Sequence, residues 1–188
     1  MDDAALIAGA REGDLDAFAE LVRRYEHRVR AVLFRLLDDE RDVEEATQDA
    51  FVQAWRNLHR FRGDAAVFTW LYRIAVNEAL ARLRRKRVAT TDLDELAETS
   101  HAAADPAGQP EHAAEASELH SFLTACIRRL APDYRAPLVL RDVVGLSNQE
   151  VADVLDLSLA ATKSRIHRAR MQIRAQLERW EEQHGSIR

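Results

Sequence analysis

Apolar side chains recur at helical spacing along most of this chain. They fall every three or four positions between residues 14 and 37, and residues 43–58 repeat the pattern. This period predicts amphipathic helices that bury one side and expose the other. It also predicts a third long helix over residues 65–87 and a short one near residues 3–11. The first half is therefore predicted to be helical.

The pattern stops and then resumes in the second half. Residues 90–118 have no sustained apolar period and contain proline, glycine, alanine and acids, which predicts a linker that is helical only at its ends. Further helices are predicted over residues 115–130 and 132–144. Gly145 is well placed to end the second of these.

Composition narrows the fold class and the possible chemistry. The 188 residues are 47% hydrophobic and 31% charged, with few glycines and prolines, which favours an all-α protein. The single cysteine, Cys126, lies in an apolar stripe and is predicted to be core. It excludes a disulfide scaffold, and the histidines show no metal-ligand spacing, so neither metal nor cofactor is expected. No apolar run is long enough for a membrane span and no signal peptide precedes the first helix, so a cytoplasmic location is expected.

The net charge of -5 conceals a strong local division. Residues 91–120 carry eight acidic side chains and no basic ones, whereas residues 82–87 and 163–174 are basic blocks. Because the Debye length is about 8 Å at physiological salt, each basic block acts locally and can bind phosphate.

A helix-turn-helix is predicted near the end of the chain. Ser147 and Glu150 have capping-box spacing and begin a short helix over residues 148–155. A tight turn at Asp156 follows, and Ser158 can cap a last helix that reaches about residue 180. This turn often needs a left-handed residue, and aspartate tolerates that conformation better than most.

The last helix is predicted to have one buried and one basic side. The buried stripe is Thr162, Ile166, Ala169, Ile173 and Leu177. The opposite side carries Ser164, His167, Arg168 and Met171, flanked by Lys163, Arg165 and Arg170. Such donors suit the base edges and phosphates of a DNA major groove. The alternative is an ordinary solvated face.

The third helix carries a second signal. Its predicted core side is Phe68, Leu71, Tyr72, Ala75, Val76, Ala79 and Leu83, and its other side is Trp70, Arg73, Asn77, Ala81 and Arg84. An indole beside arginines can stack on unpaired bases, and the preceding loop, residues 59–64, could hold an extruded base. Alternatively, Trp70 packs against another helix.

Residues 38–49 form an acidic segment. Seven of its twelve side chains are acidic, and Asp42, Glu45, Gln48 and Asp49 share one helical face. This face would repel DNA, so it is either solvated or docked on a basic protein surface.

Three ordered stretches resemble the extracytoplasmic-function (ECF) sigma factors of bacterial RNA polymerase. Residues 41–55, RDVEEATQDAFVQAW, are similar to the polymerase-binding segment of that family. Residues 61–64, FRGD, with 68–77, FTWLYRIAVN, resemble the segment for the minus-ten promoter element. Residues 145–152, GLSNQEVA, with 163–170, KSRIHRAR, resemble the helix-turn-helix for the minus-thirty-five element.

The resemblance implies two helical domains joined by a flexible acidic linker, with boundaries at residues 1–89, 90–116 and 117–188. The implied polymerase-binding residues are Asp42, Glu45, Gln48 and Asp49. Those for recognising and melting the minus-ten element are Arg62, Gly63, Asp64, Trp70, Arg73, Asn77 and Arg84. Those for the minus-thirty-five element are Lys163, Ser164, Arg165, His167 and Arg168. The implied partners are core RNA polymerase, duplex and single-stranded promoter DNA, and an anti-sigma factor.

Two features depart from the family pattern, and two other functions compete with it. Asp156 and the run Ala160-Ala161-Thr162 stand where the family usually has glycine and Gly-Thr-Val. A dimeric operator-binding regulator would also need a helix-turn-helix, although the acidic segment and the linker do not favour it. An enzyme is disfavoured because the sequence has no phosphate loop, metal cluster or nucleophile–base constellation.

Overall fold

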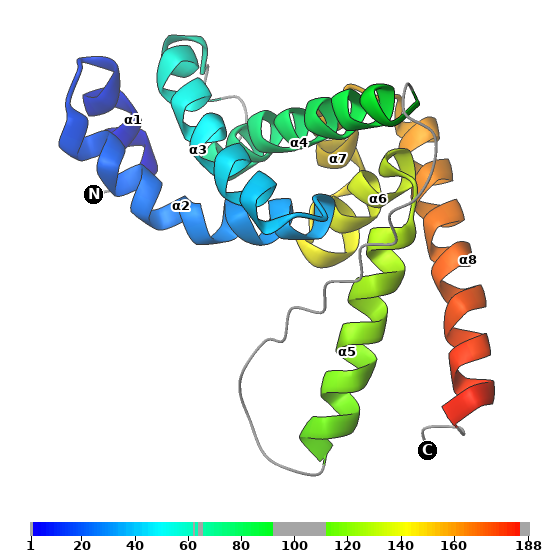
Figure 1. The fold of residues 1–188 in the computed structure, drawn as a ribbon. Coiled ribbons are helices and arrows are strands. Elements are labelled where there is room, and N and C mark those ends of the chain that lie inside the picture. The colour runs from blue at the N-terminus through cyan, green and yellow to red at the C-terminus, as the bar shows by residue number, and fades with distance from the viewer. Residues whose placement is uncertain (1, 62, 64–65, 92–111, 185–188) are drawn as a thin grey trace.

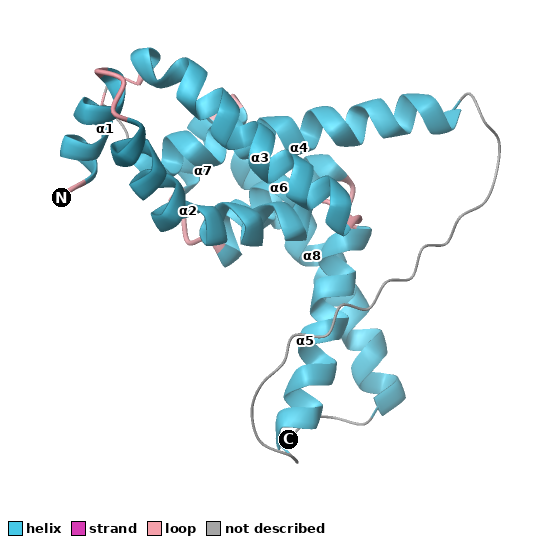
Figure 2. Cartoon of the chain, turned by 60° about the vertical axis from the view of Figure 1, so that its left-hand side comes forward, coloured by secondary structure: helices cyan, strands magenta, loops and turns pink. Residues whose placement is uncertain are grey.

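The computed structural model describes the chain except for residues 1, 62, 64–65, 92–111 and 185–188. Its described residues are helical almost throughout, and none of them lies in a β-strand (Figure 2). The α-helices are α1 (Asp3–Arg11), α2 (Leu15–Leu36), α3 (Glu40–Asn57), α4 (Val67–Thr91), α5 (His112–Arg129), α6 (Pro132–Leu138), α7 (Asn148–Leu155) and α8 (Leu159–His184). A 3-10 turn, η1 (Leu58–Arg60), follows α3, and a π-helical turn, η2 (Val139–Val143), follows α6. The all-α prediction is confirmed.

The first half, α1 to α4, is a bundle whose first three helices begin at aspartate caps. The side chains of Asp2, Asp14 and Asp39 each accept a hydrogen bond from a backbone N–H in the first turn of α1, α2 and α3. Such caps satisfy donors that a helix start otherwise leaves unpaired. The helix α2 packs against α1, α3 and α4, and Leu33 and Val76 are completely buried in the core.

The predicted core side of α4 is confirmed. Leu71, Tyr72, Ala75, Val76 and Ala79 are buried, and Phe68 and Leu83 are half-buried against the same core. On the opposite side Arg73, Asn77 and Arg84 are exposed. The helix therefore presents one polar face to solvent at the surface of the bundle.

The second half is built around α8. The helix α8 packs on α6, α7 and α5, and α5 and α8 project side by side from the body of the molecule (Figure 1). Pro137 lies inside α6, and the chain continues as the π-helical turn to Val143. Gly145 follows with a φ of 87°, which agrees with the predicted helix end. Cys126 on α5 is completely buried, as predicted, and burial raises the pKa of its thiol.

The predicted linker, residues 90–116, is described only at its two ends. There α4 reaches Thr91 and α5 begins at His112, which agrees with helical ends. The domain boundaries drawn from the sequence stay predictions.

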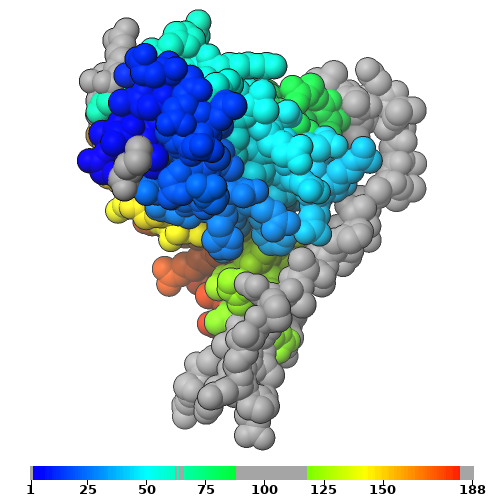
Figure 3. All heavy atoms as spheres, turned by 90° about the vertical axis from the view of Figure 1, so that its left-hand side faces the viewer, coloured from blue at the N-terminus to red at the C-terminus, as the bar shows by residue number. Residues whose placement is uncertain are grey.

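The two halves share one hydrophobic core. Val151 and Val154 of α7 are buried in the same cluster as Val76 of α4, and α2 also contacts α5 and α6. In Figure 3 the face formed by α1 and α2 (blue) and α3 (cyan) lies directly against later segments (yellow and green). The pattern of apolar positions in the sequence did not predict that the two halves pack against each other.

Arg135 of α6 is the main polar connection between the halves. The residue is 5% exposed, and its guanidinium donates to the carbonyl oxygen of Leu36 at 2.8 Å and to that of Leu130 at 3.2 Å. It also forms an ion pair with Asp38 at 3.1 Å. Burial lowers the pKa of Arg135, and Asp38 opposes this shift. One side chain from the second half thus satisfies a carbonyl at the end of α2.

Candidate nucleic-acid interface

The helix-turn-helix forms as the sequence predicts. Ser147 accepts from the Glu150 N–H at 3.2 Å, and the Glu150 carboxylate accepts from the Ser147 N–H at 2.8 Å, which completes the capping box. Asp156 has φ 54° and ψ 49°, the left-handed conformation that lets the chain turn between α7 and α8. Ser158 then accepts from the Ala161 N–H at 3.1 Å and starts α8.

The buried stripe of α8 explains one departure from the family pattern. Thr162 and Ala169 are completely buried and Ile166 is 3% exposed. The Thr162 hydroxyl donates to the Ser158 carbonyl oxygen at 3.0 Å, so this polar side chain is buried with its hydrogen bond satisfied. Threonine at this position is therefore compatible with the fold.

The opposite side of α8 is open to solvent. Lys163, Ser164, His167 and Arg168 are all exposed, whereas Arg165 is half-buried and its Nη1 lies 4.0 Å from Asp133. Arg170 is bound by both oxygens of Asp142, at 2.6 and 2.9 Å, and this pairing raises its pKa. The most accessible donors thus lie on one narrow face of the helix, the geometry that a major groove accepts.

The polar face of α4 forms a second exposed surface. Trp70 is half-buried and its ring centroid lies 5.2 Å from that of Phe61, which precedes the helix. The indole thus packs in part against a residue outside the helices, and the rest of it is exposed. Within the described residues, Arg73 and Arg84 have no carboxylate partner.

The loop before α4 is described only in part. Gly63 is exposed and has φ 79°, a conformation that glycine adopts without strain. Arg62 and Asp64, which the sequence also assigned to this site, lie outside the described residues.

The acidic face of α3 is paired with α4. Arg82 contacts Glu45 at 3.1 Å, and it also contacts Asp49, while Lys86 contacts Asp42. Hydrogen bonds from Arg41 and Arg82 hold the pKa of Glu45 below its ordinary value. Gln48 is exposed on the same face. The acidic face of α3 is therefore not simply exposed to solvent, because Arg82 and Lys86 of α4 form ion pairs with it.

This pairing changes the interpretation of two residues in the basic block 82–87, whereas Arg84 of the same block stays exposed. Arg82, only 14% exposed, and Lys86 direct their charge to α3 instead. Residues that form ion pairs between two helices are far apart in the sequence, so no local motif predicts the pairs between α3 and α4. Within α4, Arg82 also pairs with Glu78 four residues earlier, at 3.0 Å.

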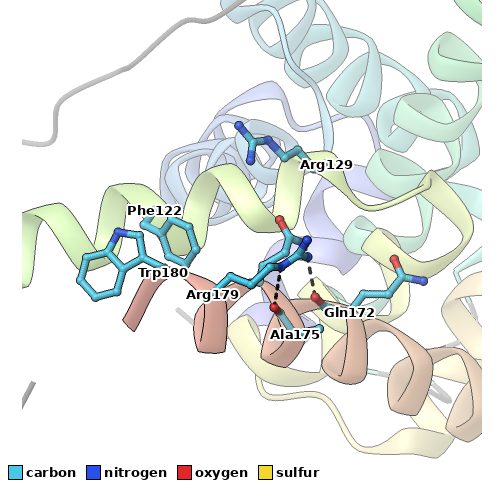
Figure 4. A pocket seen from close by; sticks show the side chains of 7 residues that line it. Phe122, Arg129, Gln172, Ala175, Arg179 and Trp180 are labelled. Atoms are coloured by element: carbon cyan, nitrogen blue, oxygen red, sulfur yellow. Dashed lines mark hydrogen bonds between the residues drawn. The ribbon is translucent and has the colours of Figure 1, made fainter. Parts of the chain in front are cut away.

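The sequence also gave no sign of a groove between the projecting ends of α5 and α8 (Figure 4). Phe122 and Trp180 stack there with centroids 5.3 Å apart, and Arg179 donates to the Ala175 carbonyl oxygen at 2.9 Å. Gln172 and Arg129 line the rest of a cavity of about 520 Å³. The groove combines an aromatic wall with basic side chains.

The described part of the chain contains neither a metal site nor a membrane span. Its histidine, cysteine and acidic side chains form no group that could hold a metal ion. None of its helices is long and apolar enough to cross a membrane.

Comparison with known proteins shows the family to which the chain belongs. The chain matches the Sigma-70 region 2 model over residues 21–88 and the Sigma-70, region 4 model over residues 123–173. It is 38% identical over 175 residues to the ECF RNA polymerase sigma-E factor of Escherichia coli, covering 90% of this chain and 91% of that protein. It is 36% identical over 174 residues to the RNA polymerase sigma-H factor of Pseudomonas aeruginosa, covering 89% and 90%.

Solved structures agree with these sequence matches. CnrH, solved in complex with the cytosolic domain of CnrY, is 30% identical, with a TM-score of 0.67 and coverage of 94% of this chain and 97% of CnrH. RpoE from Bartonella quintana, solved with the anti-sigma factor NepR, has the same fold, with a TM-score of 0.71 at 22% identity and coverage of 87% and 98%.

The helix-turn-helix and the bundle before it are thus those of a sigma factor, and the chain belongs to the ECF sigma factors of bacterial RNA polymerase. Its function is to direct core polymerase to specific promoters and so initiate transcription. The resemblance drawn from the sequence is confirmed.

Proposed function

We propose that this chain recognises a two-part promoter with two separate surfaces, α8 for the upstream element and α4 with its preceding loop for the downstream element. The observation that carries the proposal is the division of α8. Thr162, Ile166 and Ala169 fix the helix in the fold, while Lys163 and Arg168 stay exposed on the far side. A helix fixed in this way can enter a major groove without unfolding its own core.

The upstream element is read by the exposed donors of α8. Arg168 and His167 project from the middle of the exposed face, where base edges are within reach, and Ser164 and Lys163 lie one turn earlier. Arginine pairs with guanine through two hydrogen bonds, which gives sequence specificity. Arg165 is expected to contribute less, because it is half-buried beside Asp133.

The downstream element is opened and held by α4 and its loop. Trp70 presents an indole for stacking, and Arg73, Asn77 and Arg84 continue the polar face along the helix. Arg62, Gly63 and Asp64 are proposed to surround one extruded base. Stacking contributes about 1–3 kcal/mol per base, which offsets the few kcal/mol that unstacking costs.

The acidic face of α3 is proposed to bind core polymerase. Asp42, Glu45, Gln48 and Asp49 present carboxylates and an amide in one row, and Gln48 and Asp49 are exposed. Arg82 and Lys86 hold these carboxylates in position and reduce their net charge. A basic surface of polymerase would have to compete with these two cations or add to them.

An anti-sigma factor is proposed to control the chain. The relatives CnrH and RpoE were solved with CnrY and with the anti-sigma factor NepR, respectively. We propose that the chain works without catalysis in the bacterial cytoplasm, where polymerase and promoters are found. Binding of one promoter element makes the second contact intramolecular, which combines two weak affinities into a strong one.

Run-off transcription on random genomic fragments tests the proposal. Core polymerase is assayed with and without the chain, and new start sites should appear that share two upstream elements. Unchanged start sites would contradict it. A symmetric footprint made by the chain without polymerase would instead support a dimeric operator-binding regulator.

A further inference from the structure

A cavity lies at the junction of α1, the end of α3 and η1. Its volume is about 580 Å³, and it is lined by Ala10, Arg11, Gly13, Trp55, Arg56, Leu58 and His59. Arg11 and Arg56 belong to none of the surfaces assigned above, and His59 begins the loop before α4. Three of the lining residues, Arg11, Arg56 and His59, have basic side chains and come from three different elements.

The donors of this cavity have no acidic partner among the described residues. Arg56 and His59 are exposed and form no ion pair there, and Arg11 uses only its Nε, which donates to the Leu58 carbonyl oxygen at 3.2 Å. The basic side chains near the other end of α3 do have acidic partners, because Arg82 and Lys86 of α4 are bound to carboxylates of α3. The cavity is therefore a place where the first half of the chain presents uncompensated donors.

The cavity also has a rigid aromatic wall. Trp55 is half-buried and meets Phe18 edge to face, with ring centroids 4.9 Å apart. The hydrogen bond from Arg11 ties α1 to the carbonyl of Leu58, so the wall and the donors are held together. A fixed indole next to several N–H donors suits a nucleotide, which has both a flat base and a phosphate.

The cavity is close to the proposed site of base extrusion. His59 is four residues before Gly63, and four extended residues span at most about 14 Å. A strand whose base is held near Gly63 can therefore place a neighbouring phosphate in the cavity. Arginine donors bind phosphate through strong charge-assisted hydrogen bonds, and three elements supply donors here.

We infer that this cavity binds the backbone of the opened promoter strand, one phosphate at Arg56, His59 and Arg11, beside the extruded base. The inference rests on the proposed function, since it needs a single strand at the loop before α4. It adds a subsite, built from α1, α3 and η1, that would fix the strand next to this loop.

Neutral methylphosphonate linkages test the subsite one phosphate at a time. The chain is assembled with core polymerase, and its affinity is measured for single-stranded oligonucleotides that carry the downstream element of a promoter found by run-off transcription. Each linkage is neutralised in turn. The variants are Arg56→Ala and the double variant Arg56→Ala with His59→Ala, both at exposed positions. Arg23→Ala removes the same charge from an exposed site on α2 and serves as the control.

We expect one linkage at which neutralisation weakens binding of the unaltered chain roughly three- to tenfold, whereas the same neutralisation leaves binding of the double variant unchanged. The dependence of affinity on salt should also fall by about 0.7 in logarithmic slope for each phosphate that the variant no longer binds. Arg23→Ala should retain the sensitive linkage.

Two results would overturn the inference. One is a double variant that shows the same sensitive linkages as the unaltered chain. The other is a double variant that binds oligonucleotides normally but assembles poorly with core polymerase, which would make the cavity a protein contact. If the unaltered chain directs no new start sites at all, the proposed function fails first, so the two failures are distinguishable.

Discussion

At the scale of single residues, the structure separates arginines that the sequence treats alike. Arg170 is held by Asp142 and Arg165 lies beside Asp133, whereas Arg168 is exposed on the solvent-facing side of α8. An arginine already bound to a carboxylate must break that pair before it contacts DNA. Specificity for the upstream element is therefore expected to depend most on Arg168.

The first prediction concerns Arg168→Ala. Loss of one base contact should weaken promoter binding by about 1–3 kcal/mol and relax the sequence preference at one position of the upstream element. Holoenzyme affinity for a panel of single-base variants of the promoter measures both effects. Arg174→Ala, which removes an arginine paired with Glu178 further along α8, is the matched control. An equal loss on every sequence would show that Arg168 contacts only phosphate.

The second prediction concerns Trp70→Ala. The indole is half-buried against Phe61, so part of its surface is left for a base. Its removal should impair promoter opening, measured by permanganate reactivity of unpaired thymines, while duplex binding persists. Trp70→Phe should keep some opening because a ring remains, and a pre-melted template should restore transcription by Trp70→Ala. Normal opening by Trp70→Ala would remove the residue from the melting step.

At the scale of elements, the start of α7 depends on a reciprocal cap that also responds to pH. Hydrogen bonds from the Ser147 backbone N–H and hydroxyl lower the pKa of Glu150. A carboxyl whose pKa is lowered by folding stabilises the fold above its unfolded pKa, and this contribution disappears as the pH falls through its folded value. The helix-turn-helix should therefore lose stability in acid in part through this residue.

The third prediction concerns Glu150→Ala and follows from the lowered pKa of this carboxyl. Glu150→Ala should lower the free energy of unfolding by about 1 kcal/mol at neutral pH, as loss of a cap usually does. Urea denaturation at a series of decreasing pH values should show the gap between variant and unaltered chain closing in acid. Gln149→Ala, at the neighbouring position outside the box, is the control. A gap that is constant with pH would contradict the carboxylate role.

The sequence predicts elements of this molecule better than it predicts contacts between them. The apolar period located α4 and α8, and the capping box and Asp156 located the turn, because these signals are local. The pairing of Arg82 with α3 and the bond from Arg135 to Leu36 join residues far apart along the chain. The cavity beside Arg56 was missed for the same reason, since α1, α3 and η1 each supply part of it.

At the scale of the whole molecule, the proposed function requires the packed halves to separate before both promoter elements are bound. Elements about 25 base pairs apart are separated by roughly 85 Å along B-DNA. A compact chain of this length has a radius of gyration of only about 16 Å. On the proposed function, Arg135 and the shared core therefore have to release before both surfaces engage promoter DNA.

The fourth prediction concerns Arg135→Ala. It leaves the carbonyls of Leu36 and Leu130 without this donor, so the free energy of unfolding should fall by about 1–3 kcal/mol. Small-angle scattering should also show a larger radius of gyration. Asp38→Ala should change little, because Asp38 is 56% exposed and its ion pair is screened. Unchanged stability and size in Arg135→Ala would contradict the role of this contact.

The most direct test of the whole account is gel filtration of the purified chain mixed with bacterial core RNA polymerase. We predict that the chain elutes with polymerase, and that reversing the charge of Asp49 and Glu45 weakens this association. A chain that continues to elute at its own size in the presence of excess polymerase would contradict the account, whatever its affinity for DNA.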